Sequence, residues 1–208
     1  MNSCPRCGAE LSSPLGCAPC GVLFEPEREL SPFEVLGQEP AWELDLTALR
    51  KRLIQLVRMV HPDFFASASD EQRALAERHS ASLNESFETL ADDLARGDWL
   101  IRSLGGPAEG ELRDMPQAFL MEVLEWNEAL DDARAAAAGS PERARLDGLR
   151  PELEGARDAA LERLGSKLTA PSDGEALGQA RRELNALRYL RRTLDQIEDL
   201  RVEQASSR

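Results

Sequence analysis

The stretch VRMVHPDFFAS, residues 57–67, decides how this chain folds. An apolar segment with helical periodicity leads into His61-Pro62-Asp63, and two phenylalanines follow these three residues. Because proline disfavours a helical conformation in the residue before it, the helix is expected to end at this triplet. A polar triplet between apolar neighbours predicts an exposed loop that joins two helices. Taken alone, the triplet also fits ordinary turn chemistry, with His61 capping a carbonyl and Asp63 bonding local amides.

Amphipathic segments on both sides of the triplet predict an antiparallel helical hairpin. Apolar residues recur at helical spacing from Leu46 to Val60 and again from Leu75 to Leu90. We expect Asp45 or Thr47 to cap the first helix and Asp70 to cap the second. His79 fits a half-buried helix residue. The first helix also carries a basic face in an otherwise acidic chain, formed by Arg50, Lys51, Arg52 and Arg58.

The hairpin has a short helical segment on each side. Upstream, EPERELSPFEVLG (25–37) reads as a linker followed by a short apolar turn or helix. Downstream, a short helix is expected at about 92–104, because Gly105-Gly106-Pro107 is a strong stop signal. Phe64 and Phe65 are too apolar for a loop tip, so we expect at least one of them to pack between the two long helices.

Composition limits the class of protein. The chain has 208 residues, of which 30% are charged and only 5% aromatic, which favours helices over a β-sandwich. A formal charge of −13 repels phosphate backbones and argues against nucleic acid as the main partner. No run of eighteen apolar residues indicates a membrane span, and no targeting signal is evident, so a cytoplasmic protein is expected. Without a GxxxxGK[ST] loop, the chain is not expected to hydrolyse ATP itself.

The C-terminal half predicts three helices, at about 114–138, 141–168 and 173–203, with Pro151 kinking or splitting the second. Three antiparallel helices of this kind form a bundle. On the first helix, an apolar stripe that includes Phe119 and Trp126 is expected to face the core. Leu120, Met121 and Leu124 fall on the other side, together with Glu125, Glu128 and Asp132. Either this helix is central, or that side is an exposed interaction patch.

Tyr189, on the last predicted helix, lies about 160° from the middle of that helix's leucine stripe. Arginines flank it in the sequence LRYLRR. An aromatic ring off the core face is a candidate contact residue.

All four cysteines lie in the first twenty residues, as CPRCG at 4–8 and CAPCG at 17–21. The spacing of Cys4, Cys7, Cys17 and Cys20, with a glycine after each pair, suits tetrahedral zinc in a closed structural site. A redox dithiol and a rubredoxin-like iron site are the competing interpretations. A redox Cys-x-x-Cys motif usually accompanies a βαβ pattern, and none follows here. Such a short segment has no core of its own, so a bound metal would supply its folding energy.

Four motifs together resemble one family. A basic amphipathic helix, an HPD loop and an antiparallel helix look like a J-domain. The sequences HPDFF, LNESFETL (83–90), Ala95-Arg96 and FLMEVLEWNEAL (119–130) further resemble the HscB type of J-protein, the co-chaperones of iron–sulfur cluster assembly. The match runs from about residue 31 to about 200. The cysteine pairs are similar to the N-terminal module of eukaryotic members, which many bacterial members lack. Many J-domains have Lys or Arg after HPD, where this chain has Phe64.

The resemblance implies an all-α protein with three parts. Residues 1–24 would be a zinc module, residues 31–106 a J-domain, and residues 112–205 a three-helix bundle that binds the scaffold. His61, Pro62 and Asp63, with the basic face, would contact a DnaK/HscA-type heat-shock chaperone and stimulate its ATPase. The face of Leu120, Met121, Leu124, Glu125, Glu128 and Asp132, together with Tyr189, would bind IscU, the iron–sulfur scaffold protein, in a bacterial cytoplasm.

Two other functions stay open at the level of sequence. A J-protein with a different client would share the HPD loop but use the C-terminal helices for another protein. A zinc-ribbon nucleic-acid binder or a thiol redox protein would use the cysteines and keep the helices as a support. The acidic balance of the chain, and the lack of a basic stripe around the cysteines, weigh against the second of these.

Overall fold

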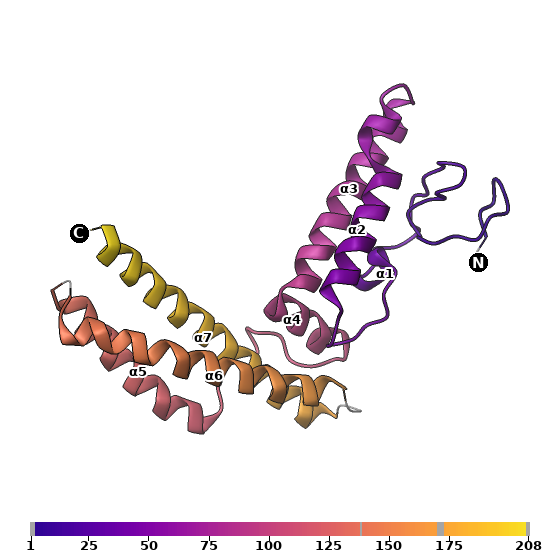
Figure 1. The fold of residues 1–208 in the computed structure, drawn as a ribbon. Coiled ribbons are helices and arrows are strands. Elements are labelled where there is room, and N and C mark those ends of the chain that lie inside the picture. The colour runs from indigo at the N-terminus through magenta and orange to yellow at the C-terminus, as the bar shows by residue number, and fades with distance from the viewer. Residues whose placement is uncertain (1–2, 138, 170–172, 207–208) are drawn as a thin grey trace. The chain divides into compact units, whose positions relative to one another are not determined.

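The computed structural model describes residues 3–137, 139–169 and 173–206. These residues form seven α-helices and one short 3₁₀ helix, and their only β-structure is two isolated bridges, so the all-α expectation is confirmed (Figure 1). The chain divides into two compact units, Met1–Arg96 and Gly97–Arg208, each of which is described by itself. Among the described helices, none combines the length and apolar character needed to cross a membrane.

Unit 1 is built on a helical hairpin. After α1 (Pro32–Leu36), α2 (Leu46–Val60) and α3 (Asp70–Ala91) pack side by side, joined by the 3₁₀ helix η1 (Pro62–Phe65) (Figure 1). A capping box between Ser31 and Glu34 starts α1. The carboxylate of Asp45 accepts hydrogen bonds from two backbone N–H groups at the start of α2, which confirms one of the two caps expected there.

The predicted cap of α3 is wrong by one position. The residue that caps α3 is Ser69, whose hydroxyl accepts the N–H of Gln72, and Asp70 is the first residue of the helix. Ser69 has the extended backbone that an N-cap requires. Asp70 instead places a negative charge in the first turn, where the positive end of the helix dipole favours it.

Two buried side chains fasten the irregular segments of unit 1 to the hairpin. Arg96, near the start of α4 (Asp93–Ser103), donates hydrogen bonds to the carbonyls of Trp42 and Leu90, and its guanidinium lies 4.7 Å from the centre of the Trp42 ring. His79 is 4% exposed, rather than half-buried as expected, and its Nε2 lies 2.8 Å from the Phe24 carbonyl oxygen. The chain on both sides of the hairpin is therefore held by hydrogen bonds made away from water.

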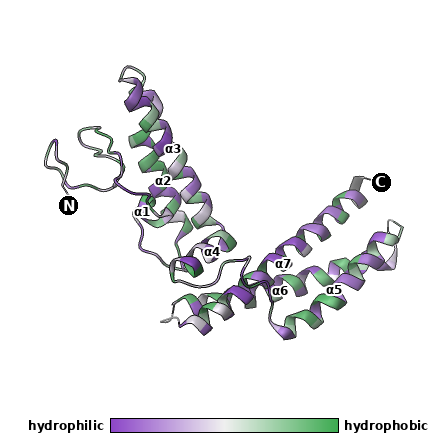
Figure 2. Ribbon diagram, turned by 180° about the vertical axis from the view of Figure 1, so that it is seen from behind, coloured by the Kyte–Doolittle hydropathy of each residue, from purple (hydrophilic) through white to green (hydrophobic). Residues whose placement is uncertain are grey.

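Unit 2 contains the long helices α5 (Gln117–Ala135), α6 (Pro141–Thr169) and α7 (Gly174–Ser206). Hydrophobic and hydrophilic residues are interspersed along all three (Figure 2). The stripe predicted to face the core is buried: Phe119, Val123, Trp126 and Leu130 are all at most 9% exposed. Pro151 lies inside α6 without splitting it, and leucines on both sides of the proline are buried.

The segment that leads into α5 is tied to α7. Arg181, whose side chain is fully buried, donates to the carbonyl of Pro107 at 2.8 Å and to the carboxylate of Asp98 at 2.6 Å. Asn185 donates to the carbonyls of Leu112 and Asp114. These bonds fix the backbone just before α5, and so fix where α5 begins within unit 2.

Candidate functional sites

The four cysteines lie on two knuckles of similar geometry. The N–H of Gly8 donates to the carbonyl of Cys4, and the N–H of Gly21 donates in the same way to Cys17, both at 2.8 Å. Both glycines have a positive φ, 72° and 69°, which glycine adopts without a steric penalty. The glycine after each cysteine pair therefore lets the backbone turn at the end of each knuckle.

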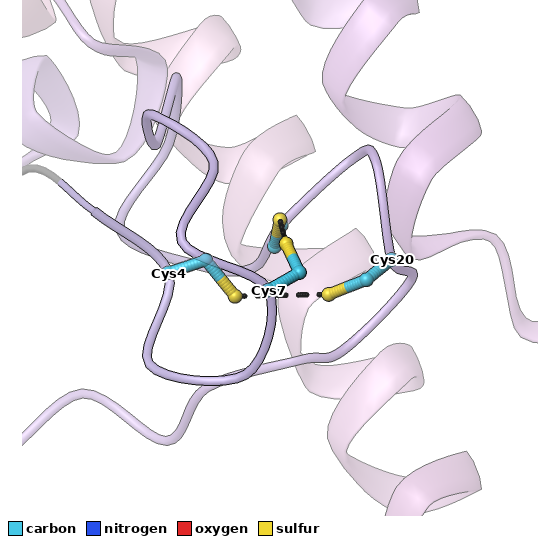
Figure 3. A group of neighbouring side chains, drawn as sticks. Cys4, Cys7 and Cys20 are labelled. Carbon is cyan, nitrogen blue, oxygen red and sulfur yellow. Dashed lines mark hydrogen bonds between the residues drawn. The ribbon is translucent and has the colours of Figure 1, made fainter.

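The knuckles bring the four sulfur atoms together. Figure 3 shows Cys4 and Cys7 from the first knuckle and Cys20 from the second pointing toward one another. All four Sγ atoms, including that of Cys17, lie within 4.8 Å of one another. The Cys4–Cys20 and Cys7–Cys17 sulfur pairs are 3.6 and 3.7 Å apart. A tetrahedral site with metal–sulfur bonds of about 2.3 Å has edges of about 3.8 Å, so the arrangement fits one metal ion.

The electrostatics of the cluster also favour a cation. Burial raises the pKa of Cys17 to about 12, and the neighbouring sulfurs act in the same direction. For Cys4, burial is the largest cause and opposes ionisation, but backbone hydrogen bonds and the neighbouring sulfurs together outweigh it and lower the pKa to about 7. The Cys17 thiol is therefore not ionised near neutral pH by itself. A bound metal ion would supply the positive charge that four adjacent thiolates need.

The HPD triplet lies at the end of α2 and presents two polar groups. The side chain of Asp63 is 88% exposed and that of His61 is 45% exposed. Nδ1 of His61 accepts the N–H of Asp63 at 3.3 Å, which caps η1 and leaves the proton of a neutral ring on Nε2. The triplet is thus a local turn, although His61 accepts an amide N–H rather than capping a carbonyl, and the turn is exposed.

The two phenylalanines after the triplet have opposite environments. Phe65 is 9% exposed and packs into unit 1, which confirms that at least one ring is buried. Phe64 is 72% exposed, and its ring meets His61 edge-on at 6.1 Å between centroids. Phe65 anchors the loop, and Phe64 adds an apolar surface next to the triplet. The sequence reasoning did not assign a role to this exposed ring.

The four predicted cations of α2 are not equivalent. Lys51 and Arg58 are exposed and share one face of the helix, two turns apart. Ile54 lies between them and is 48% exposed. Arg50 rests on the ring of Phe87, 5.3 Å from its centre. Arg52 is half-buried and donates to the carbonyls of Leu36 and Ser12, so it binds within unit 1.

In unit 2, the side of α5 opposite the core is exposed. Leu120, Met121 and Leu124 are 43%, 67% and 58% exposed, which confirms the exposure expected from the helical wheel. Glu125, Glu128 and Asp132 are exposed as well. We call these six residues the α5 patch. Three large apolar side chains next to three carboxylates are unusual on an exposed surface, so the α5 patch is a candidate interaction site.

Tyr189 of α7 lies close to α5. Its hydroxyl donates to Oδ1 of Asn127 at 2.7 Å, and its ring meets Phe119 edge-on at 5.9 Å. Tyr189 is half-buried, so part of the ring stays open to solvent. The structure thus brings Tyr189 next to the helix that carries the α5 patch, although some sixty residues separate them in the sequence.

Comparison with known proteins points to one family. The family model described as the HSCB C-terminal oligomerisation domain matches residues 115–198. The chain is 32% identical over 170 residues to the co-chaperone protein HscB homolog of Shewanella sp. (strain ANA-3), covering 80% of this chain and 96% of the relative. It is 33% identical over 140 residues to the iron-sulfur cluster co-chaperone protein HscB of Mus musculus, covering 65% and 60%. Human HscB has the same fold, with a TM-score of 0.75 at 24% identity, covering 97% and 99%.

Proposed function

The chain belongs to the HscB family of co-chaperones, and we propose that it stimulates the ATPase of a DnaK/HscA-type heat-shock chaperone and delivers an IscU-type scaffold protein to it. The name of the mouse relative, an iron-sulfur cluster co-chaperone, supports a role in cluster assembly and transfer. The chain would act as a binding protein in the bacterial cytoplasm, while the chaperone carries out the chemistry. Residues 31–106 would bind the chaperone, and residues 112–205 would bind the scaffold.

One observation carries the proposal: two exposed surfaces of different chemistry lie in different units. In unit 1, His61 and Asp63 project from a loop that Phe65 anchors. An anion and an imidazole on such a loop suit recognition of a polar surface, and Lys51 and Arg58 would steer it toward an acidic partner. Arg50, which rests on the Phe87 ring, would add a further positive charge to this surface. Arg52 is already bonded within unit 1, so we give it a lesser part in binding.

In unit 2, the α5 patch combines apolar and acidic side chains. Its apolar residues would supply affinity when a partner covers them, and its carboxylates would select a basic partner surface. Tyr189 would add an aromatic contact from α7. Because each function has its own unit, a substitution in one surface is expected to spare the other.

For the cysteine cluster we propose structural zinc. Four cysteine ligands leave no open coordination position, so the metal would hold the two knuckles together rather than catalyse a reaction. Rubredoxin-type iron would use the same four sulfur atoms. Metal analysis and the visible spectrum of the purified protein distinguish the two, because iron–thiolate sites are coloured and zinc sites are not.

The proposed function is tested with the full-length protein and two purified partners, a DnaK/HscA-type chaperone and an IscU-type scaffold. We expect the protein to raise the ATPase rate of the chaperone, and we expect the scaffold to co-elute with the protein. Stimulation without scaffold binding would instead indicate a J-protein with another client. Failure of both measurements would refute the proposal.

A further inference from the structure

A groove lined in part by arginines continues from the α5 patch toward Tyr189. It consists of two open hollows of about 490 and 530 Å³ within unit 2. The first contains Leu120 of the α5 patch, the second contains Tyr189, and both are lined by Arg113 and Met115. The groove therefore connects the two parts of the chain that were proposed to touch the scaffold.

Arg113 and Arg182 give the Leu120 end of the groove its charge. Neither arginine forms an ion pair with any residue that the structure describes. Arg188, farther along the groove, is by contrast neutralised by Asp98 and Glu109 at 3.3 and 2.9 Å. Among the described residues that line the Leu120 hollow, Asp114 is the one carboxylate, so two cations face one anion there. In a chain of net charge −13, a positive site of this kind is a local exception.

The start of α5 adds to this positive end. Pro116 precedes the helix without a side-chain cap, and the first turn holds no acidic residue. The positive end of the helix dipole is therefore not compensated where Pro116 and Gln117 line the hollow. Asn185 holds the backbone on both sides of Arg113 through the carbonyls of Leu112 and Asp114, so this arginine is presented from a fixed segment.

Along α5, the surface thus changes character from end to end. Arg113 precedes the helix, and Arg182 of α7 lines the same hollow at its start. The exposed apolar residues follow at positions 120–124, and the carboxylates end at Asp132. From Leu120 to Asp132 the helix rises by about 18 Å. A partner that covers this length must offer acidic groups at one end and basic groups at the other, because the reverse orientation would bring like charges together.

We propose that Arg113 and Arg182 form the acid-recognising end of the surface that binds the scaffold, and that they set the direction in which the scaffold lies along α5. The inference rests on the proposed function, since it assigns further residues to the same interface. Carboxylates of the scaffold would pair with the two arginines, while basic residues of the scaffold would face Glu125, Glu128 and Asp132. An apolar scaffold side chain would enter the hollow beside Met115 and Leu120.

The test is the affinity of full-length protein for a purified IscU-type scaffold, measured by calorimetry. In the variant Arg113→Glu/Arg182→Glu, we expect Kd to rise at least about tenfold at about 50 mM salt, and less at about 500 mM, where exposed charges are screened. The matched control is Arg157→Glu/Arg201→Glu, which makes the same change in net charge at two arginines outside the groove. It is expected to change Kd by less than about threefold, a small effect for surface charges.

Two further measurements keep the outcomes distinct. Arg113→Lys/Arg182→Lys keeps the charge and is expected to bind nearly as well as wild type, and thermal melts check that every variant is folded. If charge reversal leaves Kd at the control level while wild type binds the scaffold, the inference is wrong and the proposed function stands. If charge reversal instead lowers ATPase stimulation with scaffold binding intact, the groove serves the chaperone, which also overturns the inference. Absence of scaffold binding by wild type would overturn the proposed scaffold function itself.

Discussion

Replacing Leu120, Met121 and Leu124 by alanine is expected to weaken scaffold binding without weakening the fold. Full burial of one such side chain is worth about 1.5–3 kcal/mol, and these three are about half exposed, so covering the rest is worth about 1 kcal/mol each. Alanine retains a methyl group, and neighbouring substitutions do not add fully. A total loss of about 2 kcal/mol follows, which corresponds to a rise in Kd of about thirtyfold.

Calorimetric titration with an IscU-type scaffold measures this loss, and a thermal melt measures stability in parallel. The melting temperature is expected to change little, because the exposed side chains leave no cavity and alanine is the best helix former. Leu130→Ala is the matched control on the same helix. Leu130 is 1% exposed, so its truncation is expected to cost about 2–5 kcal/mol of stability.

Chaperone stimulation completes the experiment. The triple variant is expected to stimulate the ATPase of the isolated chaperone as wild type does, since the HPD loop lies in the other unit. A triple variant that melts as low as Leu130→Ala, or that binds the scaffold with unchanged affinity, would refute the assignment of the α5 patch.

Four other predictions follow from the structure. His61→Gln is expected to abolish ATPase stimulation with little change in melting temperature, because the ring is 45% exposed; a large loss of stability with stimulation intact would make the triplet purely structural. Phe65→Ala is expected to cost about 3 kcal/mol in denaturant unfolding, whereas Phe64→Ala should cost almost no stability and lower stimulation instead. Metal analysis of protein purified without added zinc should give close to one equivalent, and two free dithiols without metal would end the zinc assignment. Burial lowers the pKa of His79, so the unfolded chain binds its proton more readily and stability is expected to fall as pH drops below about 6.5. Thermal melts of wild type and His79→Gln at pH values around and below about 6.5 test this prediction. The stability of the variant should fall less steeply with decreasing pH than that of wild type.

The sequence determined the elements and much of the surface. Proline at position 62 ends a helix because of a local steric clash, and helical periodicity assigns the stripe from Phe119 to Leu130 to the core. The same periodicity places Leu120, Met121 and Leu124 on the other side of the helix, and these side chains are exposed in the structure. Two glycines after two cysteine pairs predicted a knuckle geometry. All of these are local properties, set within a few residues by backbone sterics and by the angle between successive side chains.

Tertiary structure decided what the local pattern leaves open. Ile54 belongs to the apolar segment from Leu46 to Val60 and is exposed, while Arg52 was assigned to the basic face and is bonded to two backbone carbonyls. Only the folded chain shows which of two adjacent phenylalanines is the anchor. Arg113 and Arg182 lie sixty-nine positions apart, and they line one hollow because Asn185 fastens the segment before α5 to α7. Contacts between distant segments depend on packing and on which buried polar groups find partners, and no periodicity in the sequence records them.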